Sequence, residues 1–269
     1  MVNLKHPRFF FILNMLLVSC LSMLLVSNSQ ADPGVNEEQS AWVKLVGEKY
    51  GQYPGFEPVL RKPEYPNVLI YGDSISMDYT SGVRASLSEE ANVYRIFCNG
   101  GDIARVIPAM EKMRKHMAKY WDFQWDVIHF NTGLHDLKYL DGNGLYHTIK
   151  GKQVTSQVGY KQGLINVLQY FHQVAPNATL IFATTTPVPA NAKGRNEGDA
   201  VVYNNIALDV LTAYPQVRIN DLYSLVKPKQ KDWWRRPGNV HFNKDGVAAQ
   251  VVQVSAEIKR ALQERKVKP

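Results

Sequence analysis

A serine and a histidine, far apart in the sequence, stand in surroundings suited to acyl transfer. Ser74 follows Gly72 and Asp73 directly after an apolar run, where a helical stretch begins. Glycine allows a sharp turn there, and the amides that open a helix favour a developing negative charge. His241 lies just before the last helical stretch. A histidine beside a serine acts as its general base, although a helix cap and a structural histidine are the alternative interpretations.

Two further segments offer hydrogen-bond donors. Gly100 and Gly101, within residues 99–102, expose backbone N–H groups, in an arrangement that is also typical of a turn. Residues 130–136, with the sequence Phe-Asn-Thr-Gly-Leu-His-Asp, are unusually polar for a segment that follows an apolar run. Asn131 and His135 are the side-chain donors of this segment.

These residues need a scaffold that brings them together. Short apolar runs rich in β-formers alternate with longer amphipathic stretches, which predicts an α/β fold with a parallel sheet covered by helices on both faces. Ligands of such sheets gather beyond the carboxyl ends of the strands, so the polar segments above are expected at one edge. The predicted strands are residues 67–71, 92–97, 126–131, 179–183 and 217–219.

Apolar residues at helical spacing predict three of the helices. Pro108 leaves the boundary of a further helix within residues 102–120 open. His129 lies within a predicted strand and should face the core. The apolar stripes of the three helices are Leu164, Leu168 and Phe171, then Val202, Ile206 and Val210, and finally Val247, Val251, Val254, Ile258 and Leu262.

The chain divides into three parts by composition. Residues 66–265 contain no repeat and no linker, which predicts one domain. Residues 32–65, with four prolines, are expected to form an irregular lead-in with one short helix near residues 41–50. Two loops are long enough to be functional, residues 139–156 and 187–199.

Residues 1–31 have the pattern of a cleaved signal peptide, with a basic head, an apolar stretch and Ser29-Gln30-Ala31 as the cleavage site. Secretion or a periplasmic location is therefore expected. An uncleaved membrane anchor and a lipidated Cys20 are the alternatives, and only these would bring the protein to a membrane. After cleavage Cys98 stands alone, which excludes an internal disulfide and a cysteine metal site, and it is expected to be buried.

Composition excludes several classes of function. The formal charge of +7 falls to +5 when Lys5 and Arg8 leave with the signal, because 29 basic residues then face 24 acidic ones. No run of basic residues offers a surface for nucleic acid. The sequence contains no Gly-x-Ser-x-Gly elbow, no His-Glu-x-x-His zinc motif and no phosphate-binding loop. Accordingly, no metal or cofactor is predicted.

The order of these blocks resembles the SGNH, or GDSL-type, serine hydrolases, and in particular their exported bacterial members. The resemblance spans about residues 66–263. It implies a three-layer α/β/α, flavodoxin-like fold with a five-stranded parallel sheet, and ester hydrolysis without metal or cofactor. The segments that carry it are Gly72-Asp73-Ser74, residues 99–102, residues 125–136, residues 184–188, Tyr203-Asn204, residues 220–223 and Val240-His241-Phe242.

The resemblance also implies roles for single residues. Ser74 matches the nucleophile and His241 the general base, while the amides of Ser74 and Gly101 match the oxyanion hole. In the third block the family has Gly-x-Asn-Asp with asparagine as a further donor, whereas this chain has His135 in its place. Either His135 or Asn131 is therefore expected to supply the third donor.

The fourth block departs from the family pattern at one position. An aspartate should stand three residues before the histidine, but Gly238 occupies that place. The task of orienting His241 then falls to a backbone carbonyl, to Asp232 or another acid, or to no group at all. On sequence alone the site is a Ser–His dyad.

The favoured substrate is an O-acyl ester, with acetyl preferred, on an extracellular carbohydrate. Trp233, Trp234 and Arg235, in a loop with Arg236 beside His241, are expected to stack a sugar ring and to meet an anionic substituent. The other interpretation is that both tryptophans pack the loop. Lipid esters, thioesters, and a catalytically silent protein that binds glycan or a protein partner are the remaining alternatives.

Overall fold

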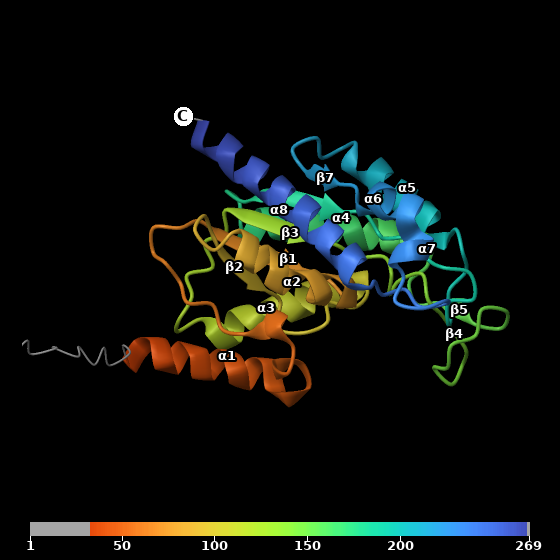
Figure 1. The fold of residues 1–269 in the computed structure, drawn as a ribbon, viewed down its shortest axis with the longest axis horizontal. Coiled ribbons are helices and arrows are strands. Elements are labelled where there is room, and N and C mark those ends of the chain that lie inside the picture. The colour runs from red at the N-terminus through yellow and green to blue at the C-terminus, as the bar shows by residue number, and fades with distance from the viewer. Residues whose placement is uncertain (1–32, 268–269) are drawn as a thin grey trace, which may run out of the picture. The chain divides into compact units, whose positions relative to one another are not determined.

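The central feature of the molecule is a five-stranded parallel sheet (Figure 1). The computed structural model describes residues 33–267, so the predicted signal peptide lies outside the described residues. Strand order is β2-β1-β3-β6-β7, and every pairing is parallel. The strands are β1 (Asn67–Tyr71), β2 (Asn92–Arg95), β3 (Val127–Phe130), β6 (Thr179–Ala183) and β7 (Arg218–Asn220).

The sheet has a doubly wound strand order. From β1 the chain adds β2 on one side, and then adds β3, β6 and β7 on the other, so the order reverses between β1 and β3. All five predicted strands are present, two of them with the predicted bounds. The residues of β1, β2, β3 and β6 are almost entirely buried because helices cover both faces, as continuous apolar runs indicate, whereas the edge strand β7 is partly exposed. A crevice at such a reversal point is the usual ligand site of this topology. Ser74 follows β1 and residues 131–136 follow β3, so both stand at that point.

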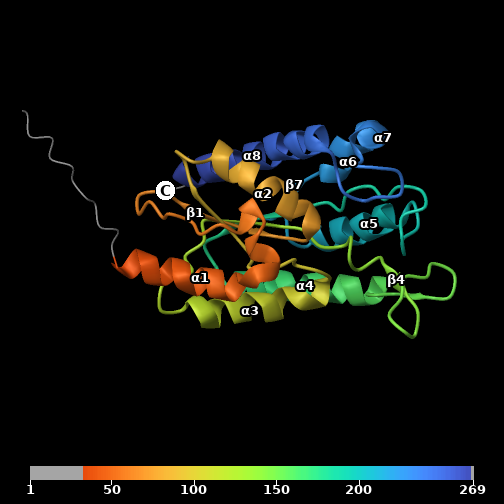
Figure 2. The same ribbon diagram turned by 60° about the horizontal axis from the view of Figure 1, so that its bottom comes forward.

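Helices form a layer on each side of the sheet, which confirms the three-layer α/β/α architecture (Figure 2). Helices α2 and α8 lie side by side on one face, and α3, α4 and α5 cover the other. Gly82 permits the close approach of α2 to α8, because a Cβ there would lie 2.5 Å from a methyl carbon of Val251. The bounds are α2 (Ser74–Ser86), α3 (Val106–Met117), α4 (Gln157–Val174), α5 (Asp199–Leu211) and α8 (Lys244–Val267).

Short elements complete the described chain. Pro108 is accommodated in the first turn of α3, where its missing N–H costs no helical hydrogen bond. No helix within residues 33–267 has both the length and the apolar character needed to cross a bilayer. The short helices are the 3-10 turns Pro54–Phe56, Ile103–Arg105 and Lys227–Lys229, together with α6 (Leu222–Val226) and α7 (Gln230–Trp233).

The lead-in is more helical than predicted. Helix α1 runs over Pro33–Gly51, with a kink at Gly47, and packs against α3. Its Trp42 is buried and donates a 2.7 Å hydrogen bond to the carbonyl of Phe56. The expected short helix is therefore only part of a longer one, because the glutamates of its first turns have basic and aromatic partners on the segment after α3 that the local sequence does not reveal.

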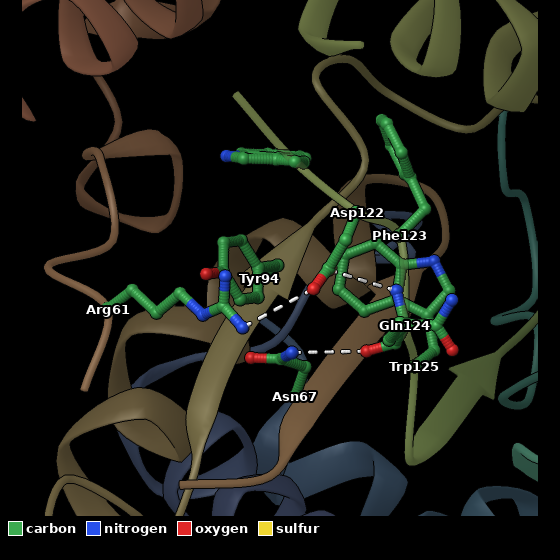
Figure 3. A pocket seen from close by; sticks show the side chains of 8 residues that line it. Arg61, Asn67, Tyr94, Asp122, Phe123, Gln124 and Trp125 are labelled. Carbon is green, nitrogen blue, oxygen red and sulfur yellow. Dashed lines mark hydrogen bonds and ion pairs between the residues drawn. The ribbon is translucent and has the colours of Figure 1, made fainter. Parts of the chain in front are cut away.

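An aromatic cluster closes the amino edge of the sheet beneath α1. Figure 3 shows this region, where Arg61 pairs with Asp122 at 3.5 Å and Asn67 donates to the carbonyl of Gln124. The hollow between these side chains measures only about 10 Å³, roughly the room that one water needs. This edge is consequently a packed support for α1. Its rings are Tyr94, Trp121, Phe123 and Trp125.

The two long predicted loops meet at the carboxyl edge. Residues 139–156 contain a small antiparallel pair, β4 (Tyr139–Leu140) and β5 (Lys152–Gln153), that the sequence did not indicate. The Tyr139 N–H donates to the carbonyl of Gly194 in the other loop at 2.8 Å. Between the loops lies an open hollow of about 580 Å³. Its lining is about equally polar and apolar, and its polar side chains include Tyr146, Asn191, Arg195, Asn196 and Glu197.

Candidate active site

Ser74 is the first residue of α2, directly beyond β1. Its neighbour Asp73 is the helix cap, because Asp73 Oδ1 accepts a 2.9 Å hydrogen bond from the Ile75 N–H. The hydroxyl of Ser74 is thus not needed for capping. Gly72 makes the turn possible, since a Cβ at that position would lie 2.0 Å from Asn131 Oδ1.

His241 lies beside Ser74, although 167 positions separate them in the chain. His241 Nε2 and Ser74 Oγ are 2.8 Å apart, and both side chains are half-buried. Ser74 lies at the carboxyl edge of the sheet because it follows β1, and His241 lies at the same edge in the loop before α8. The two residues that the sequence predicted to be neighbours are therefore within hydrogen-bonding distance.

The side chain behind His241 is Asn239. Asn239 Oδ1 lies 2.8 Å from His241 Nδ1, and the same oxygen accepts the backbone N–H of His241 at 2.8 Å. A backbone N–H only donates, so the atom that faces it must be the amide oxygen. His241 Nδ1 then donates to that oxygen, and Nε2 is left free to accept the Ser74 proton.

None of the orienting groups expected from the sequence occupies this position. Asp232 has an exposed side chain, and its backbone carbonyl accepts from Asn243. Gly238 has a φ of 70°, and a Cβ there would meet the carbonyl oxygen of Asn191 at 3.1 Å. The turn therefore favours glycine where the family pattern has aspartate, and the partner of His241 comes from the next residue.

The two backbone amides predicted to form the oxyanion hole, those of Ser74 and Gly101, differ in their hydrogen bonds. Within residues 33–267 the N–H of Ser74 has no partner. The N–H of Gly101 donates to Asn99 Oδ1 at 3.1 Å. Gly101 has a φ of 70°, and a Cβ there would clash with the Arg105 side chain at 2.7 Å, so the turn requires glycine. To bind an oxyanion, the Gly101 N–H would have to donate to it as well as to Asn99 Oδ1, or would have to give up its bond to Asn99.

The loop after β3 is braced from two sides. Asp136 Oδ1 accepts the N–H of Ile103 at 2.9 Å, which ties this loop to the one that contains Gly101. Burial raises the pKa of Asp136 to about 6, against the hydrogen bond from Ile103. From the other side, Arg195 Nε donates to the carbonyl of Leu134 at 2.9 Å. The loop that carries His135 is thus fixed by both of its neighbours.

The two predicted side-chain donors of this loop have different environments. Asn131 is only 6% exposed, and its Oδ1 is enclosed without a partner among the described residues. His135 is half-buried, and its Nδ1 lies 2.7 Å from Lys138 Nζ. Burial lowers the pKa of His135 to about 4, so its ring is neutral at physiological pH.

Burial favours the neutral form of His241, and the charges around the ring act in both directions. Burial is the largest cause that lowers the pKa of His241, and Arg235 and Arg195 lower it further, while Asp78 and Asp73 raise it. A pKa below the usual value for histidine leaves the ring unprotonated near pH 7. That is the state in which Nε2 can accept a proton.

The residues predicted to bind substrate have intramolecular contacts. Trp233 and Trp234 are half-buried and pack against the core. The backbone of Trp234 forms an isolated antiparallel β-bridge with Phe242, and the ring nitrogen of Trp234 is buried. Arg235 forms a 3.2 Å ion pair with Asp78. These contacts hold the loop that carries His241, and substrate binding by the three residues stays a prediction.

Three functional contacts were missed by sequence reasoning. The family pattern predicts an acid behind the histidine, so the sequence did not single out Asn239, although an amide two residues before the histidine was a visible signal. Arg195 gave no signal, because its contact depends on how two distant loops meet, and Lys138 gave none, because its contact with His135 depends on local side-chain geometry. Among residues 33–267 no cluster of three or more His, Cys, Asp or Glu side chains is arranged to hold a metal ion.

Among three comparisons with known proteins, only the comparison with solved structures found similar proteins. No family model matches the sequence, and no curated protein matches it either. Similar solved structures include a lipase/acylhydrolase from Enterococcus faecalis, with a TM-score of 0.55, 14% identity, and 72% of this chain and 95% of that chain covered. A member of the lipolytic G-D-S-L family from Veillonella parvula has a TM-score of 0.53, 16% identity, and coverage of 72% and 98%. The acetyl xylan esterase AlAXEase has the same four values.

These neighbours, together with the sheet order and the three layers, define the class as an α/β/α hydrolase fold with a reversal point between β1 and β3. More narrowly, the chain has the fold of the SGNH, or GDSL-type, hydrolases, as the resemblance in sequence implied.

Proposed function

We propose that this protein is a serine esterase that removes O-acyl groups, acetyl foremost, from carbohydrate. The observation that carries the proposal is the 2.8 Å contact between Ser74 Oγ and His241 Nε2, with Asn239 behind the ring. A nucleophile, a base and a group that orients the base are the parts that acyl transfer through serine requires.

The reaction would proceed through an acyl-serine. Ser74 Oγ bonds to the ester carbonyl carbon while its proton passes to His241 Nε2, and the carbonyl oxygen becomes an oxyanion held by backbone N–H donors, Ser74 foremost. The intermediate then expels the alcohol, which takes the proton from the imidazolium. Water, deprotonated by His241, attacks the acyl-serine next, and the acid leaves as Ser74 regains its proton.

Two observations support a carbohydrate ester as the substrate. The hollow between the two long loops is open and about half polar, and this open shape with polar side chains suits a sugar better than a long acyl chain. Tyr146 in its wall is 44% exposed and offers an aromatic face. The acetyl xylan esterase among the similar structures points the same way, whereas the Enterococcus faecalis lipase/acylhydrolase keeps lipid esters as the alternative.

A fluorophosphonate probe, which reacts with activated serines, tests the proposal. The folded protein should be labelled at Ser74, and Ser74→Ala and His241→Ala should lose the label. Acetate release from acetylated xylan should exceed release of fatty acid from a long-chain ester. Folded protein without a label at Ser74 would favour the silent binding protein instead. Release of fatty acid alone would favour a lipase.

We also propose that the protein is exported, through the predicted signal at residues 1–31. Glycans outside the cytoplasm would then be its substrates, and no role for nucleic acid is expected. The amino-terminal sequence of protein recovered from the expressing cells tests this proposal. A mature chain that starts near Asp32 is expected, and an intact amino terminus would point to the uncleaved anchor.

A further inference from the structure

A lysine contacts the histidine of the loop after β3. Lys138 Nζ lies 2.7 Å from His135 Nδ1, and the contact is partly buried. An ammonium group has three donors and no acceptor, so Lys138 donates and the ring nitrogen accepts. A neutral imidazole that accepts at Nδ1 carries its hydrogen on Nε2. The contact with Lys138 thereby selects one of the two tautomers of His135.

The Nε2–H of His135 is available as a donor. Within the described residues Nε2 has no hydrogen-bond partner, and the ring is half-buried. Asp73 is the largest cause that raises the pKa of His135, and it also raises the pKa of His241. The carboxylate that immediately precedes Ser74 therefore acts electrostatically on both rings. His135 is positioned by the bracing that Asp136 and Arg195 give to its loop.

We propose that Lys138 is a positioning residue, whose ammonium holds His135 in the Nε2–H form so that His135, and not Asn131, supplies the third donor of the oxyanion hole. The tautomer assignment stands on the hydrogen bond alone, and only the oxyanion step rests on the proposed esterase function. Asn131 is the weaker candidate because it is nearly fully buried and packed against Gly72.

The same contact gives a pH dependence. Burial lowers the pKa of Lys138 to about 8, and Arg195 lowers it too, while Asp73, Asp102 and Asp136 oppose this. The ring of Tyr146, 6.0 Å from Lys138 Nζ, also faces the ammonium. Above pH 8 the neutral amine has a lone pair and can accept from Nδ1, so the constraint on the His135 tautomer is released. Turnover should then decline.

Nitrogen NMR of histidine-labelled protein tests the tautomer without any substrate. In wild-type protein at pH 7, His135 Nδ1 should resonate as an unprotonated nitrogen and Nε2 as a protonated one. In Lys138→Met the two signals should shift toward the average of both tautomers. A protonated Nδ1 in the wild-type protein would overturn the proposal, whatever the enzyme activity.

Kinetics test the oxyanion step. Lys138→Met should lower kcat about 10- to 100-fold with little change in KM, a part of the 10²- to 10³-fold loss typical when such a donor is removed. His135→Ala should lower kcat at least as much, and the double variant no further. Lys138→Arg, whose charge persists above pH 8, should keep the Nε2–H form and lose the alkaline decline.

Lys193→Met is the matched control, because Lys193 also stands over the Tyr146 ring, at 5.3 Å, whereas the hydrogen bond to His135 comes from Lys138. It should leave kcat and the NMR signals unchanged. Wild-type kcat in Lys138→Met, or an additive loss in the double variant, would overturn the oxyanion step. If the wild-type protein neither turns over esters nor reacts at Ser74, the proposed function fails, and the NMR result alone decides the role of Lys138.

Discussion

Asn239 holds His241 by two hydrogen bonds to a single oxygen atom. The backbone N–H and the ring Nδ1 of His241 each lie 2.8 Å from Asn239 Oδ1. Because the backbone bond fixes which end of the amide faces the ring, Asn239 enforces the same tautomer that an aspartate would. It does so without a negative charge, so it orients the imidazole but stabilises the imidazolium less than a carboxylate.

Substitutions of Asn239 should separate orientation from charge. Asn239→Leu removes the acceptor and should lower kcat/KM on the order of 10²- to 10⁴-fold, the range seen when a base loses its orienting partner. Asn239→Asp keeps the acceptor and adds a charge, so it should raise kcat/KM about tenfold, or about 1.4 kcal/mol. It should also raise the pKa of His241. Rates measured over pH 5 to 9 check both. Equal losses in the two variants would contradict the assigned role.

The fall of kcat/KM at low pH, where His241 becomes protonated, should depend on Asp78. Asp78 raises the pKa of His241, and its ion-pair partner Arg235 lowers it. Asp78→Asn removes the stabilising charge and leaves Arg235 unpaired, and both changes lower the pKa of His241. Since the base must be neutral, kcat/KM should persist to lower pH. Asp232→Asn, which changes an exposed acid of α7, should leave the acid side of the pH profile unchanged. If the loss of kcat/KM in Asp78→Asn moved to higher pH, the assigned effect of Asp78 on the pKa of His241 would be wrong.

Restoring the family residue at position 238 should not restore a carboxylate triad. Gly238 has a φ of 70° and stands close to the carbonyl of Asn191. Gly238→Asp forces a side chain into that conformation, at a cost of about 1–3 kcal/mol. We expect a lower urea midpoint and no gain in kcat/KM. Gly142→Asp, where a Cβ meets no atom within 4 Å, is the control for added charge. Higher activity in Gly238→Asp would show that the loop can rearrange.

Helix α1 should matter for stability and not for catalysis. Trp42 is 4% exposed and stacks near Trp121 with ring centroids 5.3 Å apart, at the amino edge of the sheet. Trp42→Ala should lower the free energy of unfolding by about 3–5 kcal/mol. Val43→Ala, at a 56% exposed position of the same helix, should change it little. The kcat of folded Trp42→Ala should equal that of the wild type. A reduced kcat there would mean that α1 communicates with Ser74.

The fold was largely predictable because its signals are local. The strands β1, β2, β3 and β6 are short runs that are buried almost throughout, and each of the predicted helices exists. The apolar stripe of α5 was partly wrong, since Val202 is 38% exposed while Tyr203 and Ala207 are buried. Alternative stripes on an apolar helix differ by one residue, and only tertiary packing decides between them. The length of α1 and the β4–β5 pair were missed because both depend on contacts with distant segments.

The site was predictable only in part. The adjacency of Ser74 and His241 followed from the topology, because strands of a parallel sheet end at one edge. Their partners did not follow, since hydrogen bonds depend on turn geometry at the level of single atoms. Gly238 shows this, because its left-handed conformation shifts the orienting group to Asn239. The contact of Lys138 with His135 depends on local side-chain geometry, which no spacing rule describes.

The contact of α1 with the segment after α3 helps to determine where a tether or tag could be joined to the protein. Glu37 pairs with Lys119 at 2.7 Å near the start of α1, and Arg265 pairs with Asp126 at 3.0 Å near the end of α8. Both partners lie in the segment between α3 and β3, at the amino edge of the sheet, so the described chain enters and leaves on the side remote from Ser74. A tether, affinity tag or solid support joined at either end would hold the catalytic face outward, where a bulky polysaccharide can reach it.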